Sequence, residues 1–530
     1  MEHLSIKLDD LPDEILIIIL KKLSNVEVLY SLIGVNKRLN RIACDSVFTS
    51  NLTLYFLDKY IHSLSDSMVN RFCSQILPEI DHKIKWLNLE SKFMERILLA
   101  GNYPNLYGLG LYGIDVEKAI YLFTDDTTFI HVVKNQISSL FFYICSDKKW
   151  IPSNDVNKIV FKHIFNIFTK LEYLNFGPSL MWHQRFSFDM PSPNVISSSL
   201  LELHITVFHF NDLLYLLDGR FNQLRRFHVN IYRIQHGSSN IYRQEKLPNL
   251  RCFSLYSDMR VHYYDEFILP LLHRMLNLEE LDLHLKVDRY KGFIDGNDLK
   301  ENIINNMPRL IQFTFNIRLT NRRPNQTNLP SNEDIKHTFK DFKDNQIISC
   351  ANFFEENQFS YCHIYSYSYR MKYYDNIKNN FPGGLFKYVD NVSLFDERPF
   401  EYEFFLQIAQ SFPFMKKLTI NNNKPQKNKL YKQSKKDNQD LPIIKYLHLT
   451  NLYFDQAHDD YIEQFLINTE TYLPYKFYLF VDYEALKRVT ENFSRHATRI
   501  NCAKVHYLCI PNGPEITEHM KDYFPQINIG

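Results

Sequence analysis

Glycine, net charge and long apolar runs are all in short supply in this chain, and each shortage excludes a class of protein. Only 14 of the 530 residues are glycine, which argues against folds that depend on many tight, phosphate-binding turns. The 61 basic residues almost balance the 60 acidic ones, and the net charge of +1 gives no overall attraction for nucleic acid or an anionic membrane. The apolar run ILIIIL at residues 15–20 is far shorter than the roughly 20 residues that cross a bilayer. We therefore expect neither a nucleic-acid partner nor a membrane partner.

Sequence signatures of catalytic, cofactor and metal chemistry are also missing. The eight cysteines include no C-x-x-C pair and no Cys/His set with zinc spacing, and no P-loop, G-x-S-x-G, H-E-x-x-H or EF-hand sequence occurs. The first ten residues contain no basic segment followed by an apolar core, so we expect no signal peptide and reduced thiols. These observations predict an intracellular protein, cytoplasmic or nuclear, that is not an enzyme and has no cofactor or metal. A catalytic pocket assembled from distant parts of the chain stays open as an alternative.

Three short helices are expected at the N-terminus. Asp10 is a suitable N-cap and Pro12 fits the first helical turn, where a missing N–H costs nothing. Capping and break residues place the helices over residues 12–22, 26–33 and 37–47. The first helix is apolar on nearly all sides, which is more than two short neighbours can cover. It must therefore pack either on the rest of this chain or on a second protein.

These helices resemble an F-box domain over residues 8–48. The resemblance rests on Leu-Pro-Asp-Glu-Ile-Leu at residues 11–16, on the leucines of the second helix, and on Val-Asn-Lys-Arg-Leu at residues 35–39. One departure lies near the end of the third helix, where the family often has a tryptophan or another large aromatic residue and Phe48 is the only candidate. The resemblance implies that residues 1–50 form a domain that binds the Skp adaptor of a cullin–RING ubiquitin ligase. The residues that it assigns to this contact are Leu11, Pro12, Ile15, Leu16, Ile19, Leu29, Leu32 and Leu39.

A second pattern, L-x-x-L-x-L with conservative variants, recurs along the rest of the chain. Neighbouring copies are about 22 to 35 residues apart, and helical stretches such as residues 265–276, 297–307, 401–412 and 459–469 lie between them. Clear copies begin at Ile84, Leu106, Leu171, Leu200, Leu224, Leu250, Leu278, Leu310, Val389, Met415 and Ile444. Weaker ones begin at Ile137, Phe359, Tyr475 and Val505.

Repeated strand, turn and helix is typical of a leucine-rich-repeat solenoid. The expected fold class is therefore α/β, with a short three-helix F-box followed by a divergent leucine-rich-repeat solenoid over residues 51–530. Two polar stretches, near residues 321–345 and 421–440, interrupt the pattern and are expected to be solvated loops inserted in the array. A basic patch for an acidic partner, or a modification site, is the alternative for both.

The glycines at residues 108, 110 and 113 match the dinucleotide-binding sequence G-x-G-x-x-G. Residues 101–105, GNYPN, precede the motif where a buried strand should stand, and Leu106, Leu109 and Leu111 fit the repeat instead. Nucleotide binding is therefore not expected.

Binding positions follow from the alternation of a β-strand. The leucines of L-x-x-L-x-L point inward, so the third and fifth positions face the opposite side of the sheet, where a target protein would bind. The positions that this pattern selects are Trp86, Asn88, Tyr173, Asn175, Glu202, His204, Arg226, His228, Cys252, Ser254, Glu280, Asp282, Gln312, Thr314, Lys417, Thr419, Tyr446 and His448.

The two patterns together predict the substrate-recognition subunit of a Skp–cullin–F-box (SCF) ubiquitin ligase, which binds the adaptor at one end and an unknown protein substrate along the repeats. The alternative is a protein-interaction scaffold outside any ligase, whose N-terminal helices only cap the first repeat. In that alternative Ile15, Leu16 and Ile19 would pack on residues 51–110.

Overall fold

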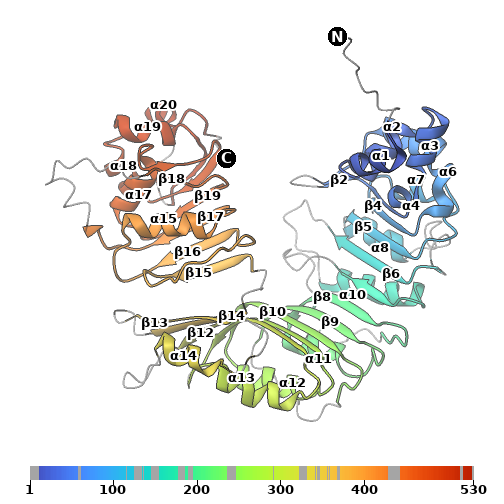
Figure 1. Ribbon diagram of the computed structural model, residues 1–530, viewed down its shortest axis with the longest axis horizontal. Coiled ribbons are helices and arrows are strands. Elements are labelled where there is room, and N and C mark those ends of the chain that lie inside the picture. The colour runs from blue at the N-terminus through green and yellow to red at the C-terminus, as the bar shows by residue number, and fades with distance from the viewer. Residues whose placement is uncertain are drawn as a thin grey trace, which may run out of the picture. The chain divides into compact units, whose positions relative to one another are not determined.

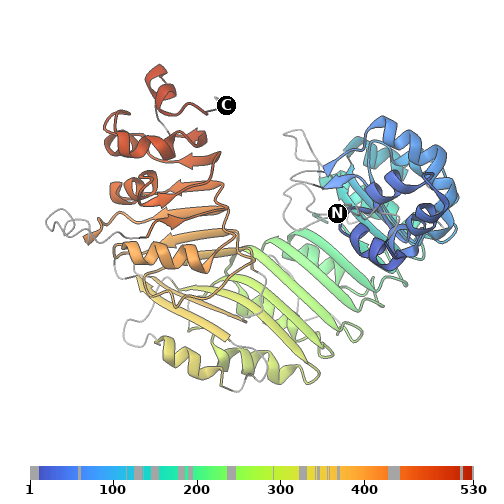
Figure 2. The same cartoon turned by 45° about the horizontal axis from the view of Figure 1, so that its top comes forward.

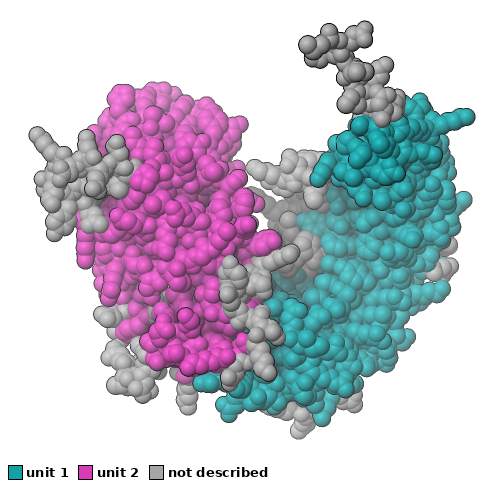
Figure 3. All heavy atoms as spheres, in the orientation of Figure 1, with its two compact units in different colours: residues 1–289, 297–317 teal, residues 290–296, 318–530 magenta. Residues whose placement is uncertain are grey.

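The structure, a computed structural model, forms two compact units of mixed α/β architecture (Figure 3). Unit 1 comprises residues 1–289 and 297–317, and unit 2 comprises residues 290–296 and 318–530. The residues described are 11–57, 61–114, 116–124, 134, 136–144, 154–176, 186–188, 195–234, 246–289, 292–321, 331–340, 342, 347–354, 356, 359–366, 371–427, 442–511, 513 and 517–527. Within these residues, no helix combines the length and the apolarity that crossing a bilayer requires.

The N-terminal region of unit 1 is helical, as the sequence predicts. Side chains cap three of its four helices: Ser24 forms a capping box with Glu27, and Asn36 and Asp45 accept hydrogen bonds from the first turns of the next two. Asp45 also divides the expected third helix into two. The four helices are α1 (Asp13–Leu20), α2 (Asn25–Leu32), α3 (Lys37–Ala43) and α4 (Ser46–Thr49).

A large sheet runs through the rest of unit 1, and its strands from β1 to β12 follow one another in chain order (Figures 1 and 2). Each pair of neighbours from β1 to β11 is parallel. The strands are β1 (Asn51–Leu54), β4 (Trp86–Glu90), β5 (Gly108–Ile114), β6 (Ser139–Ile144), β7 (Tyr173–Asn175), β8 (Glu202–His209), β9 (Arg226–Arg233), β10 (Cys252–Val261), β11 (Glu280–Asp288) and β12 (Gln312–Asn321). A separate antiparallel pair joins β2 (Phe56–Leu57) and β3 (Ile61–His62).

Helices connect most of these parallel strands, and α10 to α13 lie along one side of them (Figure 1). A parallel pair needs such a crossover because a hairpin turn would reverse the second strand. The connecting helices are α5 (Asp66–Arg71), η2 (Phe72–Ile76), α6 (Leu77–Ile80), η3 (Asp81–Lys83), α7 (Met94–Leu98), α8 (Val116–Thr124), α10 (Asn154–Ile167), α11 (Phe210–Leu216), η5 (Tyr264–Ile268), α12 (Leu269–Leu272), α13 (Gly296–Asn302) and η6 (Ile304–Asn306).

The repeated apolar positions form continuous buried rows beneath the sheet. The fourth position of the pattern pairs with its counterpart on the next strand, so that each side chain packs on a neighbour of the same kind. All members of this row are buried: Leu52, Leu87, Leu109, Leu140, Leu174, Leu203, Phe227, Phe253 and Leu281. The strand positions predicted for unit 1 are thus confirmed, whereas their assignment to leucine-rich repeats stays a prediction.

Unit 2 contains an antiparallel hairpin and a six-stranded parallel sheet. The hairpin strands are β13 (Ile347–Phe354) and β14 (Phe359–Ser366), and the parallel strands are β15 (Tyr373–Ile377), β16 (Asn391–Phe395), β17 (Lys417–Asn421), β19 (Asn451–Phe454), β21 (Phe477–Phe480) and β22 (Val505–Cys509). Two short strands, β18 (Ile444–Lys445) and β20 (Thr471–Tyr472), pair separately. The helices are α14 (Asn332–Thr338), α15 (Tyr402–Ser411), α17 (Asp459–Leu466), α18 (Tyr483–Val489), α19 (His496–Cys502) and α20 (Glu518–Tyr523).

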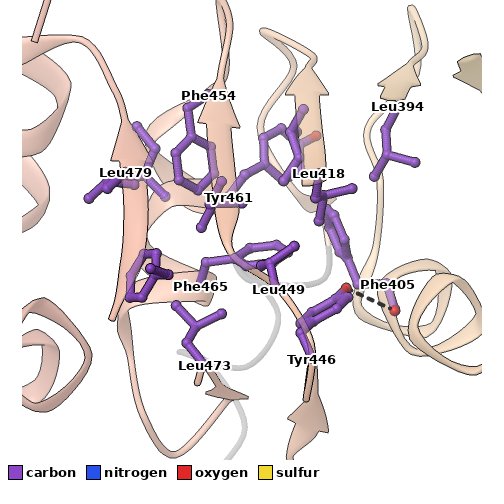
Figure 4. Packing of buried hydrophobic residues seen from close by; sticks show 14 of the residues in the cluster. Leu394, Phe405, Leu418, Tyr446, Leu449, Phe454, Tyr461, Phe465, Leu473 and Leu479 are labelled. Atoms are coloured by element: carbon purple, nitrogen blue, oxygen red, sulfur yellow. Dashed lines mark hydrogen bonds between the residues drawn. The ribbon is translucent and has the colours of Figure 1, made fainter. Parts of the chain in front are cut away.

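Aromatic and aliphatic side chains together fill the core of unit 2 between the sheet and its helices (Figure 4). Phe465 of α17 lies at its centre, with ring centroids 5.3 Å from Tyr446, 5.4 Å from Phe405 and 5.9 Å from Phe454. Such stacked and edge-to-face pairs add to the stabilisation that burial alone gives.

Three of the predicted strand copies in unit 2 need correction. The copy at Phe359 is strand β14, and its pairing with β13 is antiparallel where the repeat pattern predicts parallel neighbours. At Tyr475 the alternation is shifted, because Tyr475 and Tyr478 are exposed while Phe477 and Leu479 are buried. The third is the copy at Ile444, because its candidate site residues Tyr446 and His448 do not lie on a strand, as described below.

The two polar stretches are described only in part. Within residues 321–345, Ser331 caps helix α14, and Ile335 of that helix is buried, so this part is an ordered helix rather than the expected solvated loop. Within residues 421–440, Lys424 forms an ion pair with Glu356 at 2.7 Å, and residues 428–440 lie outside the described part of the chain.

Candidate functional site

Helix α1 carries an apolar face that the described part of the chain leaves uncovered. Ile15, Ile18, Ile19 and, just beyond the helix, Leu23 are 43, 58, 44 and 49% exposed. Their spacing of three, four and eight residues from Ile15 places them on one side of the helix. Helix α1 is also short, so these side chains lie within a small area. A cluster of exposed aliphatic side chains on one helix marks a surface for protein contact.

The opposite side of α1 is fixed to its neighbours. Leu16 and Leu20 are buried, and the guanidinium of Arg38 on α3 donates a hydrogen bond to Asp13 at 2.8 Å and another to the carbonyl of Leu11. Arg41 also pairs with Asp13. The hydrogen bond from Arg38 holds the pKa of the Asp13 carboxyl below its ordinary value of 3.8. Burial of Leu16 and Leu20 and the hydrogen bonds from Arg38 therefore fix the position of the helix that carries the exposed face.

The residues expected to bind the adaptor divide into two groups. Pro12, Ile15 and Ile19 are exposed, and Leu11 and Leu32 are half-buried. The other three, Leu16, Leu29 and Leu39, are buried within the chain, so they support the surface and do not line it. Sequence reasoning missed Ile18 and Leu23, although their helical spacing from Ile15 could have identified both.

Helices α2 and α4 anchor this region to the rest of unit 1. Both contact β1, and the amide of Asn25 donates a hydrogen bond of 2.9 Å to the carbonyl of Asn51. Arg71 donates to the carbonyl of Ile33 at 2.9 Å and lies over the ring of Tyr30. The helices that follow α1 thus attach to the sheet, and Phe48, the departure from the usual tryptophan, is buried.

Most of the candidate target-binding residues in unit 1 lie in two rows across the sheet. The register pairs third positions with third positions and fifth with fifth on successive strands. The first row contains Asn51, Trp86, Gly108, Ser139, Tyr173, Glu202, Arg226, Cys252 and Glu280, and the second contains Thr53, Asn88, Gly110, Phe141, Asn175, His204, His228, Ser254 and Asp282. Gln312 is exposed and Thr314 half-buried on β12. Their role in binding stays a prediction.

The glycines of G-x-G-x-x-G take their places in these rows. A Cβ on Gly108 would lie 2.0 Å from the indole of Trp86, and one on Gly110 would lie 2.1 Å from the side-chain oxygen of Asn88. The Trp86 indole donates to that same oxygen at 2.7 Å. Large side chains on β4 therefore require glycine on β5, which accounts for the motif without a nucleotide.

A cluster of polar rings lies where β7, β8 and β9 meet. The ring of His204 stacks on that of His228, with centroids 4.2 Å apart, and it hydrogen-bonds to Glu202 through Nε2 at 2.7 Å. Tyr173 lies 5.4 Å from His204 and accepts a hydrogen bond from Asn175. Burial, with the neighbouring His204, lowers the pKa of His228 to about 4, so its ring is neutral at pH 7.

A hollow of about 360 Å³ opens beside this cluster. It lies along the second row, and its walls combine aromatic rings with groups that form hydrogen bonds. The lining residues are Phe141, Asn175, His204, Ile205, Thr206, His228, Val229, Asn230, Ser254 and Tyr256.

Further along the rows, charges pair with one another. Arg226 lies 3.3 Å from Glu280, and both side chains are well exposed. Asp282 accepts hydrogen bonds from Ser254 and Thr314, and burial raises the pKa of its carboxyl. These groups offer both signs of charge to a partner.

In unit 2, Lys417 and Thr419 lie on a strand as predicted, whereas Tyr446 and His448 do not. Lys417 lies on β17, where its ammonium stands 4.2 Å from the ring centre of Tyr453. Tyr446 is buried, and its hydroxyl donates to the carbonyl of Phe405 at 3.1 Å (Figure 4). His448 is exposed but lies in a turn. The register of β19 shows which residues occupy the strand positions that the sequence pattern assigns to Tyr446 and His448.

The register partners of Lys417 and Thr419 on the next strand are Asn451 and Tyr453. Sequence reasoning missed both because LHLTNLYF contains a second copy of the pattern, formed by Leu449, Leu452 and Phe454, all buried.

Comparison with known proteins supports the reading of the N-terminal helices. No curated protein matches the chain. F-box domains generally bind Skp adaptors within cullin–RING ligases. The presence of such a domain in a chain therefore indicates that the chain is involved in substrate recognition by SCF-type ubiquitin ligases. Residues 8–51, which include α1 to α4, match the family model of the F-box domain, so the chain contains an F-box domain at its N-terminus.

Proposed function

We propose that this chain is a non-enzymatic substrate receptor of an SCF ubiquitin ligase, in which α1 recruits the Skp adaptor and the strand rows hold a target protein. The observation that carries the proposal is the uncovered face of α1 within a matched F-box domain. Fully burying one aliphatic side chain is worth about 1.5–3 kcal/mol. Ile15, Ile18, Ile19 and Leu23 are about half exposed, so together they supply several kcal/mol to an interface.

The target-binding part is proposed to consist of leucine-rich repeats. Parallel strands in chain order, helical connections and the shared register of the buried leucines support this assignment. The two rows present aromatic rings, imidazoles and charges of both signs, a mixture that suits a protein surface better than nucleic acid. Ubiquitination would then follow from proximity, because inside the cell the receptor holds its target beside the conjugating enzyme that carries ubiquitin.

The decisive experiment is co-purification with a Skp adaptor. The full chain is co-expressed with the adaptor beside a triple variant, Ile15→Glu, Ile18→Glu and Ile19→Glu. A matched control carries Ile196→Glu, Ile311→Glu and Leu447→Glu, which change three exposed aliphatic residues away from α1. We expect a one-to-one complex for the wild type and the control, and loss of the adaptor from the α1 variant, with unchanged circular dichroism in all three.

The proposal fails if the folded wild type binds no adaptor, or if the α1 variant binds it as well as the control does. The structure of the chain also bears on the alternative, in which the protein is a scaffold outside any ligase. A cap on the first repeat predicts that Ile15, Leu16 and Ile19 pack on residues 51–110. Leu16 is buried, but the described part of those residues leaves Ile15 and Ile19 exposed, which favours the adaptor.

A further inference from the structure

The side chains of Glu202, His204 and His228 bring three metal-ligating atoms together on one face of the unit 1 sheet. One donor atom from each residue lies within 4.8 Å of the other two. The backbone fixes this arrangement: Glu202 and His204 are two residues apart on β8, and His204 pairs with His228 on β9. A parallel ladder holds the three Cβ positions without help from any loop.

We propose that Glu202, His204 and His228 bind a divalent transition-metal ion, for which Zn²⁺ is the best fit. Two imidazoles and a carboxylate suit Zn²⁺ in number and in donor type, and such a three-residue set leaves a fourth position open. Zn–N and Zn–O bonds of about 2.1 Å place tetrahedral donors about 3.4 Å apart. The present donors lie within 4.8 Å of one another, so binding requires only a small rearrangement of the side chains.

The proposed site adjoins the hollow described above. His204 and His228 both line it, and Asn175 and Asn230 supply polar groups on its walls. A water molecule, or a carboxylate or imidazole from a captured protein, has room to complete the coordination there. The site would thus add a metal-mediated contact to the target-binding face, although the ion itself binds whether or not the chain joins a ligase.

The neighbouring charges permit a cation at this place. Arg226 adjoins Glu202 in the first row, but its guanidinium pairs with Glu280 on the far side, at 3.3 and 3.4 Å. The Glu202 carboxylate bonds to His204, a partner that becomes a fellow ligand when the ion enters. Among the described residues, binding therefore replaces the Glu202–His204 hydrogen bond and alters the His204–His228 stack.

Calorimetric titration of the EDTA-treated full chain with ZnCl₂ tests the site. We expect one ion per chain, and at least tenfold weaker binding in each of the variants Glu202→Gln, His204→Gln and His228→Gln. The matched control is His448→Gln, which removes an exposed histidine in unit 2. It should bind like the wild type, and circular dichroism should be the same for every protein.

Titration with CoCl₂ separates this site from the cysteines of the chain. Cobalt held by nitrogen and oxygen donors gives visible bands without the near-ultraviolet band of a thiolate ligand. We expect intense visible bands in the wild type and the control, and only the weak band of hydrated cobalt in His204→Gln or His228→Gln. The proposal is overturned if the wild type binds no stoichiometric ion, if the three ligand variants keep wild-type affinity, or if a thiolate band accounts for the binding.

Discussion

The indole of Trp86 on β4 occupies the space that a side chain at Gly108 on β5 would need. The two residues are register partners in the parallel ladder, and a Cβ added to Gly108 would fall 2.0 Å from ring atom Cε3 of Trp86. No real contact is that short, so either the ring or the strand must move when any other residue stands at position 108.

Gly108→Ala should therefore destabilise the chain by about 1–3 kcal/mol, the usual cost of overpacking. The same change made in a Trp86→Ala background should cost much less, because the ring that obstructs the methyl group is gone. Urea unfolding of the wild type, both single variants and the double variant, followed by circular dichroism, gives the coupling between the two positions. Strictly additive effects would show that the indole is not what excludes a side chain there.

Helix α1 predicts opposite outcomes for two neighbouring apolar residues. Leu16→Ala removes a buried side chain and should lower the free energy of unfolding by about 2–5 kcal/mol. Ile18→Ala removes an exposed one and should change it by no more than about 0.5 kcal/mol. Unfolding curves for the two variants provide the measurement, and equal losses would mean that Ile18 is covered in solution.

The same pair separates stability from adaptor binding. If the proposed docking surface is correct, Ile18→Ala weakens adaptor binding in a protein of wild-type stability. A variant at Leu16 cannot give that answer, because any loss of binding would follow from loss of the fold.

Much of the strand pattern could be read from the sequence because one physical rule governs each copy. The spacing of the apolar residues matches the alternation of a strand that buries one face, and a helix-like stretch of polar and apolar residues follows most copies. Leu87, Leu203 and Leu281 are buried where that rule places them. Local capping chemistry likewise located α2 and α3 to within a residue at their starts.

The remainder depended on contacts between segments far apart in the chain. The run ILIIIL does not show which side of α1 is covered, because Leu16 and Ile18 are equally apolar. Near residue 444, two overlapping copies of the pattern compete, and only the pairing of β19 with β17 selects the second. The Glu202–His204–His228 cluster could not be foreseen either, since it exists only when β8 and β9 pair in one particular register.

Asp13 should make the F-box region sensitive to acid. Its folded pKa lies below the ordinary value of 3.8, mainly because Arg38 donates a hydrogen bond to the carboxylate. A lowered folded pKa means that the contribution to stability is present above the unfolded pKa and disappears as the pH falls through the folded one. The difference in stability between the wild type and Asp13→Asn should thus be largest near neutral pH and shrink below about pH 4.

Unfolding curves at several pH values provide this comparison, and Glu14→Gln serves as the control because Glu14 is exposed on the same helical turn. If the difference in unfolding free energy between the wild type and Asp13→Asn stayed constant as the pH fell below about 4, the pair with Arg38 would contribute nothing to stability.

Tyr446 offers a last test, because the sequence pattern and the structure assign it opposite surroundings. If Tyr446 faced a partner, Tyr446→Phe would leave stability unchanged. In the structure its hydroxyl donates to the carbonyl of Phe405 inside the core of unit 2, and its ring stacks on Phe465. Loss of that hydrogen bond should cost about 0.5–1.5 kcal/mol. The exposed Tyr475 is the matched control, and Tyr475→Phe should stay within about 0.5 kcal/mol of the wild type in the same urea titration. Equal stability of the two variants would mean that Tyr446 is exposed, as the sequence pattern that begins at Ile444 predicts.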